Sequence, residues 1–487
     1  MVSRRHFVGG VAAATVLGFN PITRGWVSQA AAVPPSLSRI PHLDGELVTD
    51  PSVLADKASD VGNLFDRTPM AVLRPGSARD IAKMIRFCRH HDILVAGRGQ
   101  GHTTHGQSLV RGGLSIDMST LNRVHSIGSD HAVVDAGVMW RDLVPATFER
   151  GLTPPVLTGY LGLSVGGTLS VGGVSAGNAR GAQVDRVRML EVVTGEGRIV
   201  RCSAWRHRSL FTSVLAGLGQ CGIITKAVVD LVPARPMTRT YLIPYVDNAT
   251  FFADLRTLLD RNEIDDVYNM WFPDGAGGWL YMLNAVKSFD PSDPPDDSHL
   301  LRGLNYPPSQ LQIEDKPYLD YAFMVDGIIN QFRQAGLWDD VLHPWFDVFL
   351  PGRAVEQYIG EVVPTLTPED VGPAGFMLLF PQKRSELTRP LLRVPDDEWI
   401  YLFDILTSAP APGPNPDFAD RMLSRNRRLF ERARSVGGTR YPIGSLEFSA
   451  RDWVRHYRET YFAFAVMKRR YDPDGILTPG PGIFDHD

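Results

Sequence analysis

Glycine-rich runs and one histidine are the residues of this sequence whose types and spacing suit chemistry. The first run is Gly97-Arg98-Gly99-Gln100-Gly101-His102, directly after a predicted strand. Alternating glycines leave successive backbone N–H groups uncovered, so the chain can lie against a diphosphate and donate hydrogen bonds to its oxygens. Taken alone, the run is explained equally well as a structural turn with a surface histidine. The spacing is GxGxGH rather than the GxGxxG of nicotinamide-binding folds, which disfavours such a fold.

Two further glycine-rich runs strengthen the interpretation as a cofactor cradle. Residues 165–173 read VGGTLSVGG, and residues 217–225 read GLGQCGIIT as they lead into a predicted strand. Dense glycine lets backbone pack on a flat ring or a phosphate, and Thr168 and Ser170 are suited to add side-chain donors. The run at 165–173 could also be a β-bulge or a packing seam of small residues. Three loops of this kind in one region are harder to explain as turns alone.

The elements that must position these runs follow from the pattern of apolar and turn residues. From Arg67 to Pro233, short β-rich runs alternate with helical stretches, as in an α/β or α+β region. We expect strands over 71–75, 93–96, 132–136 and 223–231, helices over 77–91 and 140–150, and a hairpin of 189–193 with 199–202. After Met237, longer helical segments mix with aromatic-rich strands, and 290–297 is a loop. Residues 449–470 are predicted to be helical and 471–480 to be turns.

Length and composition narrow the class of protein. A chain of 487 residues is too long for one hydrophobic core, so we expect two domains. Hydrophobic residues at 44% and charged residues at 21% are ordinary globular values. The formal net charge of -4 and the lack of a basic tract make nucleic acid an unexpected partner. Cys88, Cys202 and Cys221 have neither metal-type nor disulfide-framework spacing, so we expect no metal site and no essential disulfide.

The N-terminus reads as an export signal. Residues 3–7 form the twin-arginine pattern SRRHF, an apolar stretch covers 8–19, and small residues at 30–32 suit cleavage. The apolar stretch is too short to cross a bilayer core of ~30 Å as a helix, so we expect no stable membrane insertion. The alternative is an ordinary cytoplasmic start or a short anchor. We predict a signal peptide over 1–32 and export by the twin-arginine route, to a periplasm or outside the cell.

The order of motifs along the chain resembles cytokinin dehydrogenase, within the larger vanillyl-alcohol-oxidase type of FAD enzymes. The motifs include GRGQGHTTHGQS, VGGTLSVGGVS, AGLGQCGIITKA, GLW, HPWFDVFLPGR and YDPDGILTPGPGIF, and the likeness extends from Arg67 to Phe484. It implies an α+β fold with a PCMH-type FAD-binding domain in two parts, 38–236 and 446–487. Between them, 237–445 would form an α+β substrate domain with an antiparallel sheet covered by helices.

The resemblance also implies the cofactor and the residues that hold it. FAD would be attached covalently through His102, since a neutral imidazole can attack the electrophilic methide tautomer of the flavin's dimethylbenzene ring. Residues 159–164 contain no Cys for a second tether. The remaining cofactor contacts implied are Gly97, Arg98, Gly99, Gln100, Gly101, Thr103, Gln107, Gly166, Gly167, Thr168, Ser170, Gly172, Gly219 and Ile224.

Two positions depart from the family's pattern. Gly159 stands where cytokinin dehydrogenases carry the Asp that accepts the substrate's proton, and Pro481 stands where they carry a Gln that can contact flavin. A substitute base must come from elsewhere, and the candidates are Tyr160, Asp347 and His105. Each has an ordinary alternative role, such as a solvated loop carboxylate or a hydrogen-bonding neighbour. Trp338 and Trp345 fall on the stretch that lines the family's substrate slot, although core packing explains a buried Trp as well.

These residues favour an oxidase or dehydrogenase that takes a hydride from a small amine or alcohol onto covalently bound FAD. Oxygen or another acceptor would then reoxidise the flavin. Cytokinin cleavage with a relocated base is an alternative within the enzymes. A flavin-holding protein that binds a ligand without turnover is an alternative from another class, which the missing Asp favours and the intact attachment motif opposes. The residues leave the substrate, the electron acceptor and the oligomeric state open.

Overall fold

The computed structural model of the chain describes residues 16–20, 25–28 and 40–484, with side chains from 40 to 484. Most of the predicted signal segment, 1–32, lies outside these residues. Where it is described, β1 (Val16–Asn20) and β2 (Gly25–Ser28) pair antiparallel. Within the described ranges, no helix has the length and apolar composition needed to cross a membrane.

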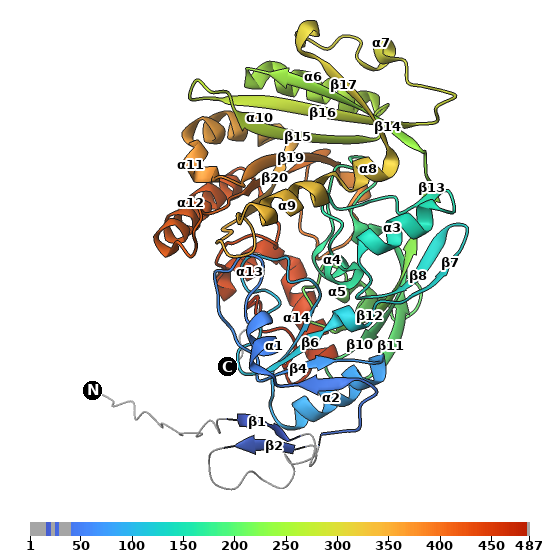
Figure 1. Cartoon of the computed structure of the whole chain (residues 1–487), viewed down its shortest axis with the longest axis vertical. Coiled ribbons are helices and arrows are strands. Elements are labelled where there is room, and N and C mark those ends of the chain that lie inside the picture. The colour runs from blue at the N-terminus through green and yellow to red at the C-terminus, as the bar shows by residue number, and fades with distance from the viewer. Residues whose placement is uncertain (1–15, 21–24, 29–39, 485–487) are drawn as a thin grey trace.

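Two sheets build the lower half of the molecule (Figure 1). The first has the order β3-β4-β6-β5, with β4, β6 and β5 parallel to one another. The second has the order β11-β10-β12-β8-β7 and is antiparallel throughout. Their strands are β3 (Glu46–Val48), β4 (Ala71–Arg74), β5 (Val95–Arg98), β6 (Leu114–Asp117), β7 (Val124–Ile127), β8 (His131–Asp135), β10 (Val187–Val193), β11 (Ile199–Ser203) and β12 (Ile223–Asp230).

An 8-stranded antiparallel sheet of order β17-β14-β16-β15-β19-β20-β18-β21 crosses the upper half (Figure 1). Its side chains alternate between two faces, as the strand repeat requires. In β20, Tyr401 and Phe403 pack into the core on one face, whereas Leu402 and Asp404 point to the other face, toward the lower half. The strands are β14 (Met237–Tyr245), β15 (Asp266–Pro273), β16 (Trp279–Phe289), β17 (Gln312–Pro317), β18 (Phe346–Pro351), β19 (Phe376–Lys383), β20 (Trp399–Leu406) and β21 (Thr439–Arg440).

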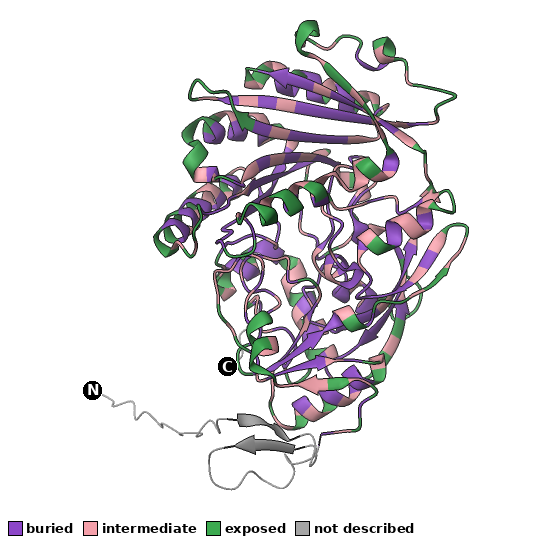
Figure 2. Cartoon of the chain, in the orientation of Figure 1, coloured by how far each residue is buried: buried purple, intermediate pink, exposed green. Residues whose placement is uncertain are grey.

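Helices cover both faces of this large sheet. On the outer face α6 (Asn248–Arg261), α10 (Gly352–Val362) and α12 (Pro416–Ser435) share its core. On the inner side lie α8 (Tyr318–Ala322) and α9 (Met324–Gln334). Figure 2 shows exposed positions along one side of α9, and its apolar residues turn inward at helical spacing. The other short elements are α1 (Pro51–Asp56), α7 (Asp297–Leu300), α11 (Pro368–Val371), β9 (Leu152–Thr153) and β13 (Val232–Pro233).

The end of the chain returns to the lower half. Helices α13 (Ala450–Tyr457) and α14 (Glu459–Tyr471) place Trp453 and Phe464 in the same core as the strands of the lower sheets. Beyond α14, Thr478 N donates to Val95 O at 2.8 Å, and Val95 N donates to Ile476 O at 2.8 Å. The last segment therefore lies beside β5, the strand that leads into the first glycine run.

Most of the predicted elements are confirmed, with ends that differ by a residue or two. The strand expected over 93–96 begins at Val95 and runs to Arg98. The remaining lower-half elements follow the predictions: β4, β8 and β12, the helices α2 (Ala78–His90) and α3 (Trp140–Phe148), and the hairpin of β10 with β11. The α+β fold class is confirmed by these mixed layers.

Two predictions about local structure were wrong. The run at 165–173 was expected to be a loop, but α4 (Val165–Val171) is a helix, with α5 (Arg208–Val214) further along the same half. Glycine has a low helix propensity, but close packing requires it at position 166 of this helix. A Cβ on Gly166 would lie 2.7 Å from the Cβ of Ala136, which is too close. Residues 449–470 were expected to form one helix. They form α13 and α14, which are separated at Arg458, whose φ is 51°.

Candidate active site

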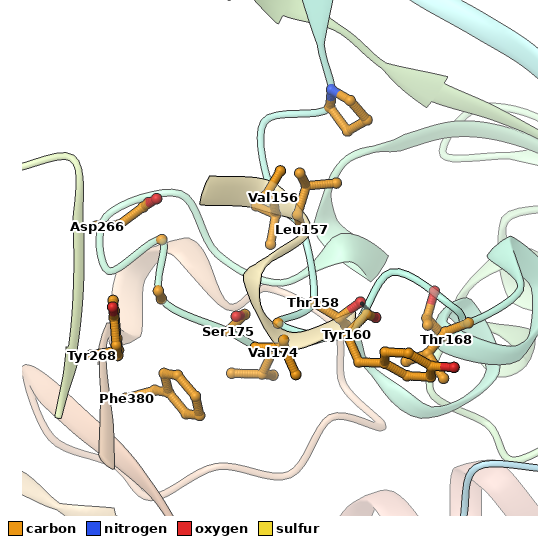
Figure 3. A pocket seen from close by; sticks show the side chains of 18 of the residues that line it. Val156, Leu157, Thr158, Tyr160, Thr168, Val174, Ser175, Asp266, Tyr268 and Phe380 are labelled. Carbon is orange, nitrogen blue, oxygen red and sulfur yellow. Dashed lines mark hydrogen bonds between the residues drawn. The ribbon is translucent and has the colours of Figure 1, made fainter. Parts of the chain in front are cut away.

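A cavity of about 1510 Å³ lies between the two halves of the molecule. Single ligands usually occupy about 300–1,000 Å³, so this cavity can hold a large cofactor together with a substrate. The glycine runs bound it from the lower half, and the inner face of the large sheet bounds it from above. In Figure 3, Tyr160 and Thr168 lie on one side of the cavity and Asp266, Tyr268 and Phe380 on the other.

The first glycine run leaves the end of β5 and presents bare backbone to the cavity. The N–H groups of Gln100, Gly101, His102 and Thr103 donate no hydrogen bond to any residue in the described part of the chain. Gly101 has a φ of 63°, a conformation that favours glycine. Consecutive free N–H groups beside a cavity are what an anionic diphosphate requires. This run therefore fits the dinucleotide cofactor that the sequence motifs imply.

Buried hydrogen bonds fix the run in place. Asp60, 3% exposed, accepts from Gly106 N at 2.7 Å and from Thr103 Oγ1 at 3.4 Å. Thr104 N donates to Ile443 O at 2.9 Å, which ties the run to the segment after β21. Burial raises the pKa of Asp60 to about 6. Sequence reasoning missed Asp60, because no motif surrounds it.

The His102 ring lies at the end of the run, among aromatic side chains. The centroid of its ring is 5.1 Å from that of Tyr160, 5.4 Å from that of Trp345 and 6.5 Å from that of Trp338. Burial, with smaller effects from the charges of His343 and Arg333, lowers the pKa of His102 to about 3. The imidazole is therefore neutral at physiological pH. Its nitrogens have no hydrogen-bond partner among residues 40–484, so a lone pair is available to a reaction partner.

The helix α4 supplies a second wall of the cavity, but its hydroxyls are already engaged. Thr168 Oγ1 accepts from Trp140 Nε1 at 3.0 Å and donates to Val165 O. Ser170 Oγ donates to Gly166 O at 2.7 Å. By contrast, the Ser164 hydroxyl is buried at the cavity with no partner among the described residues, so it is the free donor of this wall. Sequence reasoning did not select Ser164.

The third glycine run closes the cradle against the end of the chain. Gly219 has a φ of 71°, and its carbonyl accepts from Thr478 Oγ1 at 3.1 Å. Ile224, at the start of β12, lines the cavity beside Gly219. The Pro481 carbonyl accepts from Trp453 Nε1 at 2.9 Å, so the backbone of Pro481 is held to helix α13.

The structure brings most of the predicted site residues to this one cavity. Those that line it are Gly97, Gly99, Gln100, Gly101, His102, Thr103, Gln107, Tyr160, Gly166, Gly167, Thr168, Ser170, Gly219, Ile224, Trp338 and Trp345. Arg98, His105, Gly172 and Asp347 are not among the lining residues. Arg98 donates to Ser59 O at 2.6 Å, and His105 packs edge-on against Phe65 with a centroid distance of 4.8 Å.

Tyr160 and Gly159 form the wall beside His102. The Tyr160 hydroxyl accepts from Arg141 Nη2 at 2.9 Å. Arg141 also pairs with Asp326 at 3.0 Å, and Asp326 accepts from the backbone of the same segment. At Gly159 the space is open, because the nearest atom to an added Cβ would be Val325 Cγ2 at 3.5 Å. The backbone of this segment would therefore accept a side chain at Gly159.

Two carboxylic acids on the large sheet also line the cavity, and sequence reasoning missed both. Asp266 begins β15 and accepts from the Tyr321 hydroxyl at 3.1 Å, and burial raises its pKa. Asp404 is 4% exposed and faces Asp347 across the β18–β20 pair. A single acid within the apolar strand WIYLFDIL was the signal for Asp404.

Comparison with known proteins agrees with this geometry. A family model described as "FAD binding domain" matches residues 69–203, and one described as "Cytokinin dehydrogenase 1, FAD and cytokinin binding" matches residues 245–484. The chain is 36% identical over 433 residues to an uncharacterized oxidoreductase of the fasciation locus of Rhodococcoides fascians, covering 89% of this chain and 97% of that protein. It is 33% identical to cytokinin dehydrogenase 1 of Arabidopsis thaliana over 470 residues, covering 88% and 80% of the two chains.

A solved structure gives the same fold. The crystal structure of 6-hydroxy-D-nicotine oxidase from Arthrobacter nicotinovorans matches with a TM-score of 0.68 and 21% identity, covering 89% of this chain and 96% of that one. The fold, the glycine cradle and the relatives agree from the first glycine run to the C-terminal segment. The chain therefore belongs to the cytokinin dehydrogenase family and is an FAD-dependent oxidoreductase.

Proposed function

We propose that the enzyme holds FAD covalently through His102 and oxidises a small amine or alcohol. When bound, FAD supplies a two-electron acceptor for a hydride. One observation carries the proposal: a neutral, unpartnered imidazole stands at the end of a run of free N–H groups, facing a cavity large enough for a dinucleotide.

The chain's own residues divide the remaining work. The free N–H groups from Gln100 to Thr103 bind the diphosphate, and the Ser164 hydroxyl adds a donor. The aromatic rings of Tyr160, Trp338 and Trp345 surround His102 and form a wall for a flat ring system. The inner face of the large sheet covers the cavity from above.

Glycine at position 159 limits which substrates the enzyme can oxidise, because it supplies no base. We infer that it replaces the Asp that accepts a proton from the substrate amine in cytokinin dehydrogenases. A positioned base contributes about 10²-fold to 10⁴-fold to such a reaction. A substrate amine that is already neutral, or an alcohol served by another base, suits a site with glycine at this position.

Oxidation of a cytokinin with a relocated base is the second candidate. Its support is the identity of 33% to a cytokinin dehydrogenase over most of both chains, together with the buried acid Asp404 at the cavity.

The covalent link is tested by intact mass after denaturation. Wild-type protein should carry the mass of FAD, and His102→Ala should not, because its ring is the attachment point. His105→Ala is the matched control, since His105 lies on the same loop but packs against Phe65 outside the cavity, and it should keep the adduct. Equal, unmodified masses for wild type and His102→Ala would remove the covalent link from this proposal.

The reaction is tested by anaerobic bleaching of the flavin absorbance. A panel of primary and secondary amines, alcohols and isopentenyladenine should contain a compound that bleaches the wild-type protein. Readmission of oxygen or of a quinone then identifies the electron acceptor by the rate at which absorbance returns. A flavin that stays oxidised across the whole panel would favour a binding protein without turnover.

A further inference from the structure

Two buried carboxylic acids face each other on the roof of the cavity. Asp347 on β18 lies directly opposite Asp404 on β20 in the antiparallel register. They are 3% and 4% exposed. Like charges directly opposite each other on paired strands repel, and the low dielectric of the interior strengthens that repulsion. Two ionised carboxylates cannot occupy this position, so the pair must hold a proton.

The hydrogen bonding around the pair supports the same conclusion. Both oxygens of Asp347, and Oδ1 of Asp404, are buried and receive no hydrogen bond from an N–H or O–H donor of the described residues. Buried charged oxygens without donors are strongly disfavoured. A proton held between the two carboxyl groups removes one of the two charges and gives their oxygens a hydrogen-bond donor. Gly444 leaves the space for the Asp347 carboxyl group, because a Cβ there would lie 2.1 Å from Asp347 Oδ2.

Asp404 faces the same cavity as His102. It is a lining residue, and Asp347 lies behind it. Asp347 O accepts from Tyr441 N at 3.0 Å, and two residues later Ile443 O accepts from Thr104 N on the His102 loop. Trp345, which meets the His102 ring, precedes Asp347 by two residues, so their Cα atoms are at most about 7 Å apart. The pair therefore lies beside the region that a ring attached to His102 would fill.

The charged and titratable neighbours of the pair fix where its proton lies. The buried Arg440 guanidinium, held between the rings of Phe448 and Trp453, stabilises negative charge on Asp347. The Tyr441 phenol stays neutral, because burial raises its pKa. Burial raises the pKa of Asp347 to about 7, and burial together with the charge of Asp347 raises the pKa of Asp404. The charge thus faces Arg440 and the proton lies on Asp404.

We propose that the Asp347–Asp404 pair accepts the proton of the substrate nitrogen, in place of the carboxylate missing at Gly159. The inference rests on the proposed function and adds the base. The substrate C–H bond breaks with its electron pair passing as hydride to the flavin, the N–H bond breaks, and a C=N bond forms. The N–H proton passes to Asp404 while the proton of Asp404 moves to Asp347, so the pair changes from one negative charge to none.

The two acids have different roles in this reaction. Asp404 is the catalytic residue, because it faces the substrate. Asp347 is a positioning residue, because it acts only through Asp404. The substrate class that follows is an amine with a removable N–H proton, and the reaction should fail at low pH, where both acids are protonated and no acceptor is left.

The first test needs no turnover. Infrared difference spectra of the holoenzyme, recorded against pH, should contain the carbonyl stretch of a buried protonated carboxylic acid. Above pH ~7, Asp404→Asn should abolish this band, since Asp347 beside Arg440 is then ionised. Asp266→Asn removes the other acid of the inner sheet face and should leave the band in place. A band unchanged in Asp404→Asn would overturn the proposal.

The second test follows anaerobic bleaching by isopentenyladenine against pH. The wild-type rate should fall as pH drops below about 7, where the pair becomes fully protonated. Asp404→Asn should slow bleaching by ~10²-fold or more and lose this pH dependence. Asp347→Asn should keep a pH dependence but move it to lower pH, because the neighbouring negative charge is gone.

Failure of the acid pair's role and failure of flavin oxidation would give different results. Asp404→Asn protein that bleaches at the wild-type rate with the wild-type pH profile would overturn the pair's role while leaving flavin chemistry intact. Wild-type protein that stays oxidised with isopentenyladenine would contradict oxidation of this compound. In that case the infrared band decides whether the pair holds a proton, and its absence would overturn the inference.

Discussion

At the scale of single residues, burial removes charge from groups of opposite sign around one cavity. It lowers the pKa of His102 to about 3, so that the imidazole is neutral and nucleophilic. It raises the pKa of Asp347 to about 7, so that an acid ionised in water holds its charge only weakly. One physical cause, the loss of water, therefore suits His102 to the proposed attachment and the acid pair to the proposed proton transfer.

Gly159→Asp should restore a base close to the flavin. The added side chain has room, since its Cβ would meet Val325 Cγ2 at 3.5 Å, an ordinary contact. In the Asp404→Asn background, where the proposed acceptor is missing, the substitution should raise anaerobic bleaching by isopentenyladenine by ~10²-fold. Stopped-flow absorbance measures this rate.

Gly159→Asn in the same background is the matched control, because it has the same size but no basic carboxylate. It should leave the slow rate unchanged. Equal rates in the Asp and Asn variants would mean that position 159 does not reach the substrate nitrogen, and that the pocket has diverged in shape as well.

The sequence predicts those site residues whose chemistry is local. His102 and its glycines were found because adjacent residues form the motif. The pairing of Asp404 with Asp347 became visible only in the structure, because it depends on strand register, which a single sequence does not determine. Asp60 was missed for a similar reason, since its hydrogen bonds reach a loop far along the chain.

At the scale of elements, the structure departs from the sequence pattern where packing or backbone strain decides. Strands such as β4 and β12 followed from apolar runs bounded by turn residues. Helix α4 did not, because its glycines disfavour a helix. The close contact with Ala136 explains the glycine at position 166. The break between α13 and α14 could not be predicted from the sequence, because arginine is common in helices and Arg458 is held at positive φ only in the folded chain.

Arg458→Gly should stabilise the protein. Arg458 has a φ of 51° and a ψ of -132°, a conformation that glycine adopts without the clash of a Cβ, and its side chain is exposed. Relief of this strain should raise the free energy of unfolding by about 1 kcal/mol, partly offset by the greater freedom of glycine in the unfolded chain. Urea unfolding followed by circular dichroism measures the change.

Arg455→Gly is the control within the same helix. Arg455 is exposed and lies inside α13, where glycine should lower stability by about 1 kcal/mol. Opposite signs for the two substitutions would support strain at the helix break. A loss of stability in both would show that the Arg458 side chain stabilises the break through contacts of its own.

At the scale of the whole molecule, the site exists only where the two halves meet. The lower half provides His102 and the free N–H groups, and the large sheet provides Asp404. The C-terminal segment completes the lower half of the site, since Thr478 contacts both β5 and Gly219. The proposed attachment of FAD would therefore require a chain that has already folded to its end, which bears on the proposed export.

Export by the twin-arginine route suits a protein that must fold around FAD before it crosses a membrane, and we propose that this enzyme uses it. Replacing Arg4 and Arg5 by Lys should retain the protein in the cytoplasm, because the pathway reads the arginine pair. Arg24→Lys, in the same segment but outside the pair, should be exported normally.

Cell fractionation with immunoblotting measures the location, and flavin fluorescence of the denatured protein measures the adduct. The retained variant should still carry FAD, because attachment precedes export. Retained protein without flavin would show that attachment occurs after translocation. Export of the variant at the wild-type level would rule out the twin-arginine route.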